Sequence, residues 1–121
     1  MAFDERLAQR VIEWFGPDPA ISTKKMFGGL CVLHHGNMAL GILGDELMVR
    51  VGPDAYEASL RLTGAREMDF TKRPLRGMVM VAPDVLVEDH QLDAWISLAL
   101  GFVGGLPPKA GGKAGGLGPS G

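Results

Sequence analysis

The chain has 121 residues and a mass of 12.9 kDa, which is the size of one domain with a single hydrophobic core. Hydrophobic residues make up 46% of the chain and charged residues 21%, values that are typical of a globular protein and exclude a disordered one. The formal net charge of -2 argues against nonspecific nucleic-acid binding, because such binding needs a cationic surface.

The first predicted element is a helix from Asp4 to Phe15. Asp4 can cap the free backbone amides of its first turn, and apolar residues repeat at i, i+4, i+7 and i+8 from Leu7, which marks one buried stripe. The sequence Gly-Pro-Asp-Pro at 16–19 then ends the helix, because proline cannot donate a helical hydrogen bond.

From Ser22 to Val51 the apolar residues follow a period of two, which predicts β-strands. Short turns at 35–37 and 44–45 divide the second part of this region into three antiparallel strands. We expect Gly36 and Asn37 to adopt positive φ in the first of these turns. The first strand alternates, with Leu30, Val32 and His34 on one side and Cys31, Leu33 and His35 on the other.

A second helix is predicted to open at 52–54 and to close at Gly64. Its buried side would carry Ala55, Ala58 and Leu62. Two further strands follow, at about 66–70 and 77–82, joined by the basic loop 71–76.

A third helix is predicted from near Asp89 to Val103, and Gly104 with Gly105 ends it. Its buried face comprises Leu92, Trp95, Ile96, Ala99 and Val103. Residues 105–121 are rich in glycine, proline and lysine, which is typical of a flexible tail. The chain therefore divides into a folded domain at 1–104 and a tail at 105–121.

The predicted order is α-β-β-β-α-β-β-α, a two-layer α+β domain with a five-stranded antiparallel sheet. If the helices cover one face of the sheet, the other face still receives apolar side chains, whereas a solvated face would alternate into polar ones. We therefore expect a partner surface on that face, most simply that of a two-fold homodimer. The predicted interface residues are Cys31, Leu33, Met48, Val79 and Val81.

A second candidate site lies at the start of the sheet. Lys24 and Lys25 precede Phe27 and the pair Gly28-Gly29, so that backbone amides and ammonium groups could contact an anion. The Walker pattern is absent, and glycine next to a strand usually marks a bend or bulge. Both interpretations remain open at this point: an anion or small-molecule sensor, or a structural turn.

No catalytic or metal-binding constellation emerges from the remaining reactive side chains. His34 and His35 are neighbours on a strand, so their side chains would leave opposite faces, and no Cys/His pattern matches a zinc signature. Cys31 lies in an apolar strand, where a free cysteine behaves as a small hydrophobe. We expect no cofactor, no metal and no enzymatic activity, with a Cys31–histidine enzyme as the alternative.

Three features indicate a soluble cytoplasmic protein without membrane association. Cys31 is the only cysteine, so no disulfide can form within the chain. The N-terminal residues include acids and an arginine where a secretory signal would be apolar. No apolar run approaches the roughly 18–20 residues that span a bilayer.

The chain resembles the N-terminal domain of the TfoX/Sxy competence regulators over about residues 3–103. The resemblance rests on KMFGGL at 25–30, the Gly36-Asn37-Met38 turn, ELMVRV at 46–51 and GMVMVAP at 77–83. It implies an α-β(3)-α-β(2)-α fold similar to secretion-chaperone-like domains, and a bacterial cytoplasmic protein linked to the regulation of DNA-uptake genes. The full-length regulators carry a second, helical C-terminal domain, whereas a glycine-rich segment follows here.

The resemblance brings no catalytic residues with it. The leading hypothesis is therefore a small non-enzymatic interaction module, an accessory of transcriptional regulation that acts as a homodimer or with another protein partner. The sensor that uses Lys24 to Gly29 is the alternative, and direct nucleic-acid binding is disfavoured.

Overall fold

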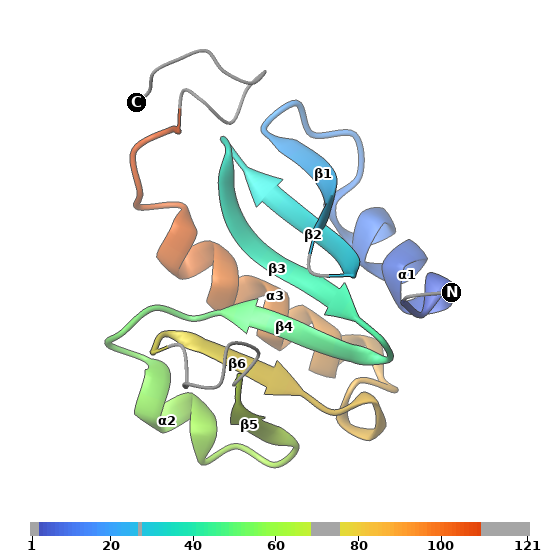
Figure 1. Ribbon diagram of the computed structural model, residues 1–121, viewed down its shortest axis with the longest axis vertical. Coiled ribbons are helices and arrows are strands. Elements are labelled where there is room, and N and C mark those ends of the chain that lie inside the picture. The colour runs from blue at the N-terminus through green and yellow to red at the C-terminus, as the bar shows by residue number, and fades with distance from the viewer. Residues whose placement is uncertain (1–2, 27, 69–75, 110–121) are drawn as a thin grey trace.

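The computed structural model describes residues 3–26, 28–68 and 76–109. Within these ranges a six-stranded antiparallel sheet of order β1-β2-β3-β4-β6-β5 packs against helices (Figure 1). The helices are α1 (Glu5–Phe15), α2 (Tyr56–Leu60) and α3 (Asp89–Val103), with a short 3₁₀ turn at Pro83–Val85. The strands are β1 (Ile21–Met26), β2 (Gly29–His34), β3 (Asn37–Leu43), β4 (Glu46–Arg50), β5 (Ala65–Glu67) and β6 (Met78–Val81).

This arrangement confirms the predicted two-layer α+β class and adds one strand to the prediction. β1, with the sequence ISTKKM, forms the edge of the sheet and pairs antiparallel with β2. Its side chains are mostly exposed, so it lacks the strong apolar alternation that identified its neighbours. The order is therefore α-β(4)-α-β(2)-α within the described residues, in place of the predicted α-β(3)-α-β(2)-α.

Helix α1 begins where the sequence predicted. The Asp4 side chain accepts hydrogen bonds from the backbone N–H groups of Arg6 and Leu7, at 2.9 and 3.2 Å. Leu7, Ala8 and Val11 are buried against the sheet. Trp14 is 37% exposed, so only part of the predicted apolar stripe faces the core.

The β2–β3 turn differs from the prediction by one residue. His34 pairs with Asn37, and the two residues between them, His35 and Gly36, have φ angles of 48° and 83°. Two central residues with positive φ match the twist of a hairpin. Asn37 is therefore the first residue of β3 and is not in the turn itself.

All three helices contribute to one hydrophobic core on a single face of the sheet. The five predicted core residues of α3 are all buried there. Val79 and Val81 also lie in this core, which corrects their prediction as residues of the uncovered face. The reason is register: Val79 pairs with Val49, and Val81 pairs with Leu47, both of which face the helices.

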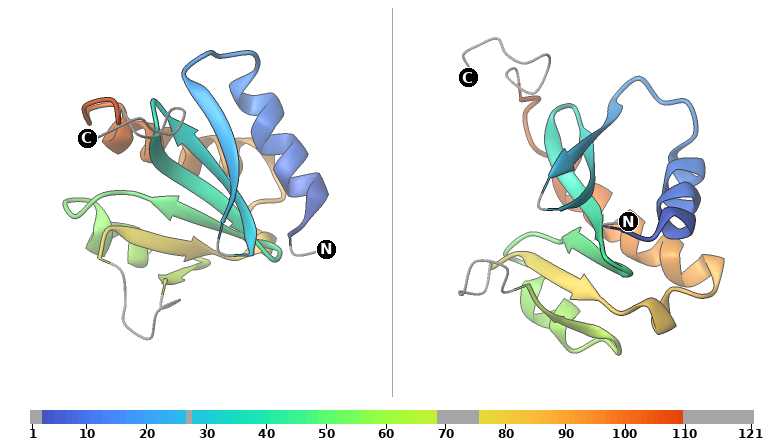
Figure 2. Two further views of the ribbon diagram at one scale, coloured as in Figure 1. Left: turned by 45° about the horizontal axis from the view of Figure 1, so that its top comes forward. Right: turned by 45° about the vertical axis from the view of Figure 1, so that its right-hand side comes forward.

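The opposite face of the sheet carries a second cluster that is rich in sulfur. Cys31, Met48, Met68 and Met80 are buried, with exposed fractions of 5% or less. Register brings three of them together, because Cys31, Gly41, Met48 and Met80 are successive partners across β2, β3, β4 and β6. The sheet is strongly twisted, with β1–β3 running obliquely to β4 and β6 (Figures 1 and 2).

Helix α2 is shorter than predicted and buries different residues. Tyr56 and Ser59 are its buried residues, whereas Ala58 is exposed and Leu62 is 51% exposed. The fourth predicted strand, at about 66–70, corresponds to β5, which begins at Ala65 and ends at Glu67. The predicted loop 71–76 lies outside the described residues except for its last position.

Residues 105–109, the first part of the predicted tail, contact the β2–β3 turn. The Asn37 side chain donates a hydrogen bond to the Pro107 carbonyl, at 2.9 Å, and the Lys109 N–H donates to the His35 carbonyl, at 2.8 Å. The rest of that segment, 110–121, lies outside the described residues. In the part of the chain that the structure describes, no helix combines the length and the hydropathy needed to cross a membrane.

Candidate functional site

The structure does not bring the predicted anion-binding residues together. Lys24 and Lys25 are exposed neighbours on β1, so their side chains leave the strand on opposite faces. Lys24 pairs with Cys31 on the sulfur-rich side, and Lys25 pairs with Leu30 on the helix side. Phe27 lies outside the described residues.

The two glycines of this motif have structural roles. Gly28 has a φ of 77° in the β1–β2 turn, a conformation that favours glycine. Gly29 is buried, and a Cβ there would collide with the Ile42 carbonyl and the Leu43 side chain. The motif therefore supports the bend interpretation and the close approach of β2 to β3.

Three of the predicted interface residues belong to the interior of the single chain. Cys31 and Met48 are 0% exposed and Leu33 is 8% exposed. Among the described residues of that sheet face, none is a large hydrophobic side chain open to solvent. The second face was thus predicted correctly as apolar, but the predicted interface residues on it are already buried within the single chain, and only Met26, Met38, Leu43 and Met78 around them are partly exposed among its described hydrophobic residues.

The reactive side chains that the sequence singled out are a buried cysteine and two histidines that contact each other at the end of β2. Burial raises the pKa of the Cys31 thiol, which disfavours the nucleophilic thiolate. The His34 and His35 rings lie 4.6 Å apart at 80°, closer than expected, because His35 belongs to the turn. Within the described ranges, no three histidine, cysteine, aspartate or glutamate side chains are grouped as metal ligands would be.

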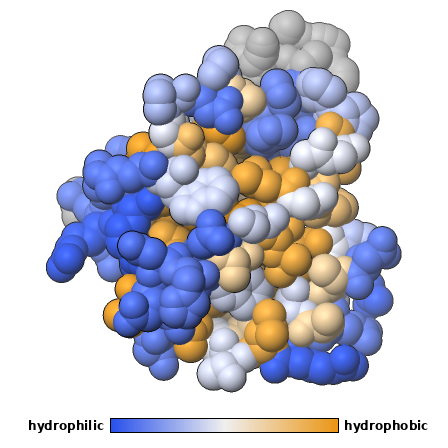
Figure 3. Space-filling model, turned by 180° about the vertical axis from the view of Figure 1, so that it is seen from behind, coloured by the Kyte–Doolittle hydropathy of each residue, from blue (hydrophilic) through white to orange (hydrophobic). Residues whose placement is uncertain are grey.

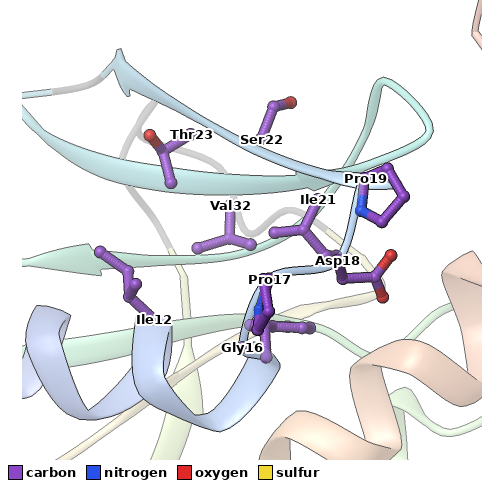
Figure 4. Close-up of a pocket in the computed structure, with 10 residues that line it drawn as sticks. Ile12, Gly16, Pro17, Asp18, Pro19, Ile21, Ser22, Thr23 and Val32 are labelled. Carbon is purple, nitrogen blue, oxygen red and sulfur yellow. The ribbon is translucent and has the colours of Figure 1, made fainter.

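A groove lies between α1 and the helix-facing side of β1, where the helix leaves the edge of the sheet uncovered (Figure 4). It has a volume of about 540 Å³. Ile12 of α1 and Ile21 and Val32 of the sheet point toward the space between them (Figure 4). The loop 16–19 closes one end, and Asp18 in this loop is held by its own contact with the Ala20 N–H.

The outer edge of β1 runs along this groove. In the described part of the chain, β1 pairs only with β2 and forms one end of the sheet. Ser22, Thr23, Lys24 and Lys25 are exposed. An edge strand offers a row of backbone N–H and C=O groups to which another chain can pair. We call this combination of strand edge and groove the β1 site.

Hydrogen bonds fix α1, and therefore one wall of the β1 site. The Arg10 guanidinium donates to the Leu86 carbonyl at 2.8 Å and to the Val87 carbonyl at 3.4 Å. The Trp14 indole N–H donates to the Asp93 carboxylate at 2.9 Å. α1 is thus attached to the start of α3 and lies beside β1 in both views of Figure 2.

Sequence reasoning identified the lysines of β1 but missed the groove. Ile21 could have indicated the groove, because it is an apolar residue that precedes the lysines in β1 and packs against the core. β1 was not predicted as a strand because most of its residues are exposed and polar. The distance between α1 and a strand edge cannot be inferred from a local sequence pattern.

Comparison with known families agrees with the resemblance seen in the sequence. The model of the TfoX N-terminal domain family matches residues 13–103, which is most of the chain. The chain therefore belongs to the TfoX N-terminal domain family. No curated protein and no solved structure is significantly similar to it.

Proposed function

We propose that the protein is a non-enzymatic interaction module, an accessory of transcriptional regulation that binds another protein through the β1 site. Membership of the TfoX N-terminal domain family supports a role related to regulation. The observation that carries the proposal is a six-residue strand edge, open within the described residues, beside a preformed apolar groove. Strand addition to such an edge is a common mode of protein recognition.

Site-specific photocrosslinking in cells tests this function. A photoreactive amino acid at Thr23 should crosslink to a protein partner, because this position is exposed on the strand edge. The same group at Glu57, exposed on α2, is the matched control. Absence of any crosslink from position 23, or the same crosslinked products from both positions, would overturn the proposal.

Self-association is the second candidate, and helix α3 favours it. α3 crosses behind the sheet in Figure 1. Figure 3 views the molecule from that side and shows hydrophobic surface across the middle of the molecule. From Ala94 to Val103 the helix has no charged residue, although Ala94 and Ser97 are exposed. A solvent-facing helix surface normally carries charged residues, so this face fits a two-fold homodimer.

Sedimentation velocity at micromolar concentration tests the homodimer. Ala94→Arg should dissociate the dimer, because it places a charge on the exposed, uncharged surface of α3 that would form the contact. Ala58→Arg is the control, since Ala58 is also an exposed helical alanine but lies on α2. A wild-type protein that remains monomeric, or a dimer that survives Ala94→Arg, would contradict this candidate.

A further inference from the structure

The backbone of β1 presents a specific set of free groups at its outer edge. The His35 N–H donates to the Ala20 carbonyl at 2.8 Å, at the open end of the β1–β2 ladder. In an antiparallel ladder, hydrogen-bonded pairs alternate with non-bonded ones. Ala20 and His35 form a hydrogen-bonded pair, so every second residue of β1 after Ala20 also bonds to β2. Thr23 and Lys25 lie between these residues, and their backbone N–H and C=O groups therefore point away from β2. These two residues therefore offer the pairing positions of the edge.

The groove beside this edge suits small apolar side chains. Thr23 pairs with Val32, which lines the groove, and Ile21 lies two residues earlier on the same side of β1. Both side chains therefore face the groove. The volume of about 540 Å³ lies within the roughly 300–1,000 Å³ range of ligand pockets. A strand added beside β1 would direct every second side chain into this space.

Charge identifies the kind of strand that fits. Lys24 and Lys25 are exposed, and neither forms an ion pair with any described residue. β1 contains no acidic residue. Two copies of β1 paired antiparallel would bring four lysines onto adjacent strands, and like charges opposite each other are destabilising. The edge therefore favours an acidic partner strand over a second copy of itself.

We propose that β1 binds an extended acidic segment of a partner protein as an added antiparallel strand, which rests on the proposed interaction function. Two consecutive acidic residues would lie opposite Lys25 and Lys24. Apolar residues would follow opposite Thr23 and Ile21, with their side chains in the groove. The segment recognised is thus acidic, acidic, apolar, any residue, apolar, in the direction from N- to C-terminus.

Fluorescence anisotropy with two synthetic peptides tests the charge and the register. The first peptide carries Glu-Glu-Val-Thr-Val, and the second carries Lys-Lys-Val-Thr-Val with the same flanking residues. The glutamate peptide should bind more tightly by roughly tenfold or more, since two cross-strand charge pairs are at stake. Its affinity should fall as salt is added. No binding of the glutamate peptide, or equal binding of both peptides, overturns the proposal. The lysines would then serve to prevent aggregation through the exposed strand edge.

A charge exchange provides the sharper test. The double variant Lys24→Glu with Lys25→Glu should reverse the preference and bind the lysine peptide. Both positions are exposed, so the variant should keep the circular dichroism spectrum of the wild type. An unchanged preference for the glutamate peptide would place binding elsewhere and overturn the proposal.

Backbone pairing is tested from both sides of the contact. Thr23→Pro removes an outward N–H and leaves the β1–β2 ladder intact, so binding should be lost while the melting temperature changes little. If this variant does not fold, the glutamate peptide methylated on the backbone nitrogens that face β1 tests the same pairing with wild-type protein. Binding that survives N-methylation overturns strand addition.

The outcomes separate this inference from the proposed function. A crosslink from Thr23 to a protein partner, together with failure of the glutamate peptide, retains the interaction module and overturns the acidic strand. A dimer that Thr23→Pro dissociates would make a second copy the occupant and would also overturn it.

Discussion

Gly41 lies opposite Cys31 in the β2–β3 ladder, and its lack of a side chain makes room for the sulfur cluster. A Cβ at Gly41 would stand 3.1 Å from the Cys31 Sγ, 3.0 Å from the Met48 Cε and 3.2 Å from the Leu30 carbonyl oxygen. These three contacts are all tighter than ordinary van der Waals packing. The glycine is therefore part of the packing on this face of the sheet.

Gly41→Ala should lower the free energy of unfolding by about 1–3 kcal/mol, because the backbone carbonyl of Leu30 cannot easily move aside. Urea denaturation measures the effect. Gly101→Ala is the matched control, since Gly101 lies in α3 with no neighbour near its missing Cβ. That substitution should raise stability by about 0.5–1 kcal/mol through helix propensity. Equal effects of the two substitutions would show that position 41 has spare space.

The Cys31 thiol should resist alkylation in the native protein. The residue is 0% exposed and burial raises its pKa, so both access and the thiolate fraction are reduced. Mass spectrometry after iodoacetamide treatment should show slow labelling that becomes rapid in denaturant. The reference is Ser22→Cys in a Cys31→Ala background, because Ser22 is exposed. Native labelling of Cys31 at the reference rate would reopen the possibility of a nucleophilic role.

The same pKa shift predicts a loss of stability at alkaline pH. The folded thiol has a raised pKa, so its contribution to stability is complete below the unfolded thiol value of about 8.5 and declines as the pH rises above it. Denaturation curves of the wild type and Cys31→Ala across this range isolate the contribution. If the stability difference between the two proteins does not change with pH, the shift is absent.

Met48→Ala tests whether the sulfur-rich face is core or interface. Met48 is 0% exposed in the single chain, so truncation should cost about 2–5 kcal/mol of folding free energy. Val87→Ala should change stability by less than about 0.5 kcal/mol, because Val87 is 67% exposed. An interface residue would behave differently, weakening self-association with little change in the stability of the monomer. That second result would restore the predicted sheet-face dimer.

The fold was predictable from the sequence where local patterns and tertiary structure agree. α3 shows this agreement, since its five predicted core residues are all buried and its helix ends at the predicted Val103. β1 was missed because its exposed edge position removes the apolar alternation on which strand prediction relies. Val79 was placed on the wrong face because the register of β6 against β4 is a long-range property.

The candidate site shows the same division. The lysines of β1 were visible as an unusual local concentration, but alternation on a strand separates them, and only the strand assignment reveals this. The groove depends on the placement of α1, which is set by hydrogen bonds from Arg10 to carbonyl groups at least 76 positions later in the sequence. Neither spacing nor composition encodes such a contact.

Arg10→Met tests how α1 is held in place beside β1. The substitution removes hydrogen bonds to the Leu86 and Val87 carbonyls but keeps an apolar side chain of similar length. Because Asp89 is fully solvated, the lost ion pair adds little, and we expect a cost of roughly 1–2 kcal/mol from the hydrogen bonds. Hydrogen–deuterium exchange should also increase in α1, as the helix opens locally more often.

Arg6→Met provides the comparison for Arg10→Met, because Arg6 is an exposed residue on the same helix. It should change the free energy of unfolding by less than about 0.5 kcal/mol and should leave hydrogen–deuterium exchange in α1 unchanged. Peptide binding at the β1 site should weaken in Arg10→Met alone, since a mobile α1 no longer presents a preformed groove wall. If Arg10→Met binds peptide as the wild type does, the strand edge alone carries the recognition and the groove contributes nothing to it.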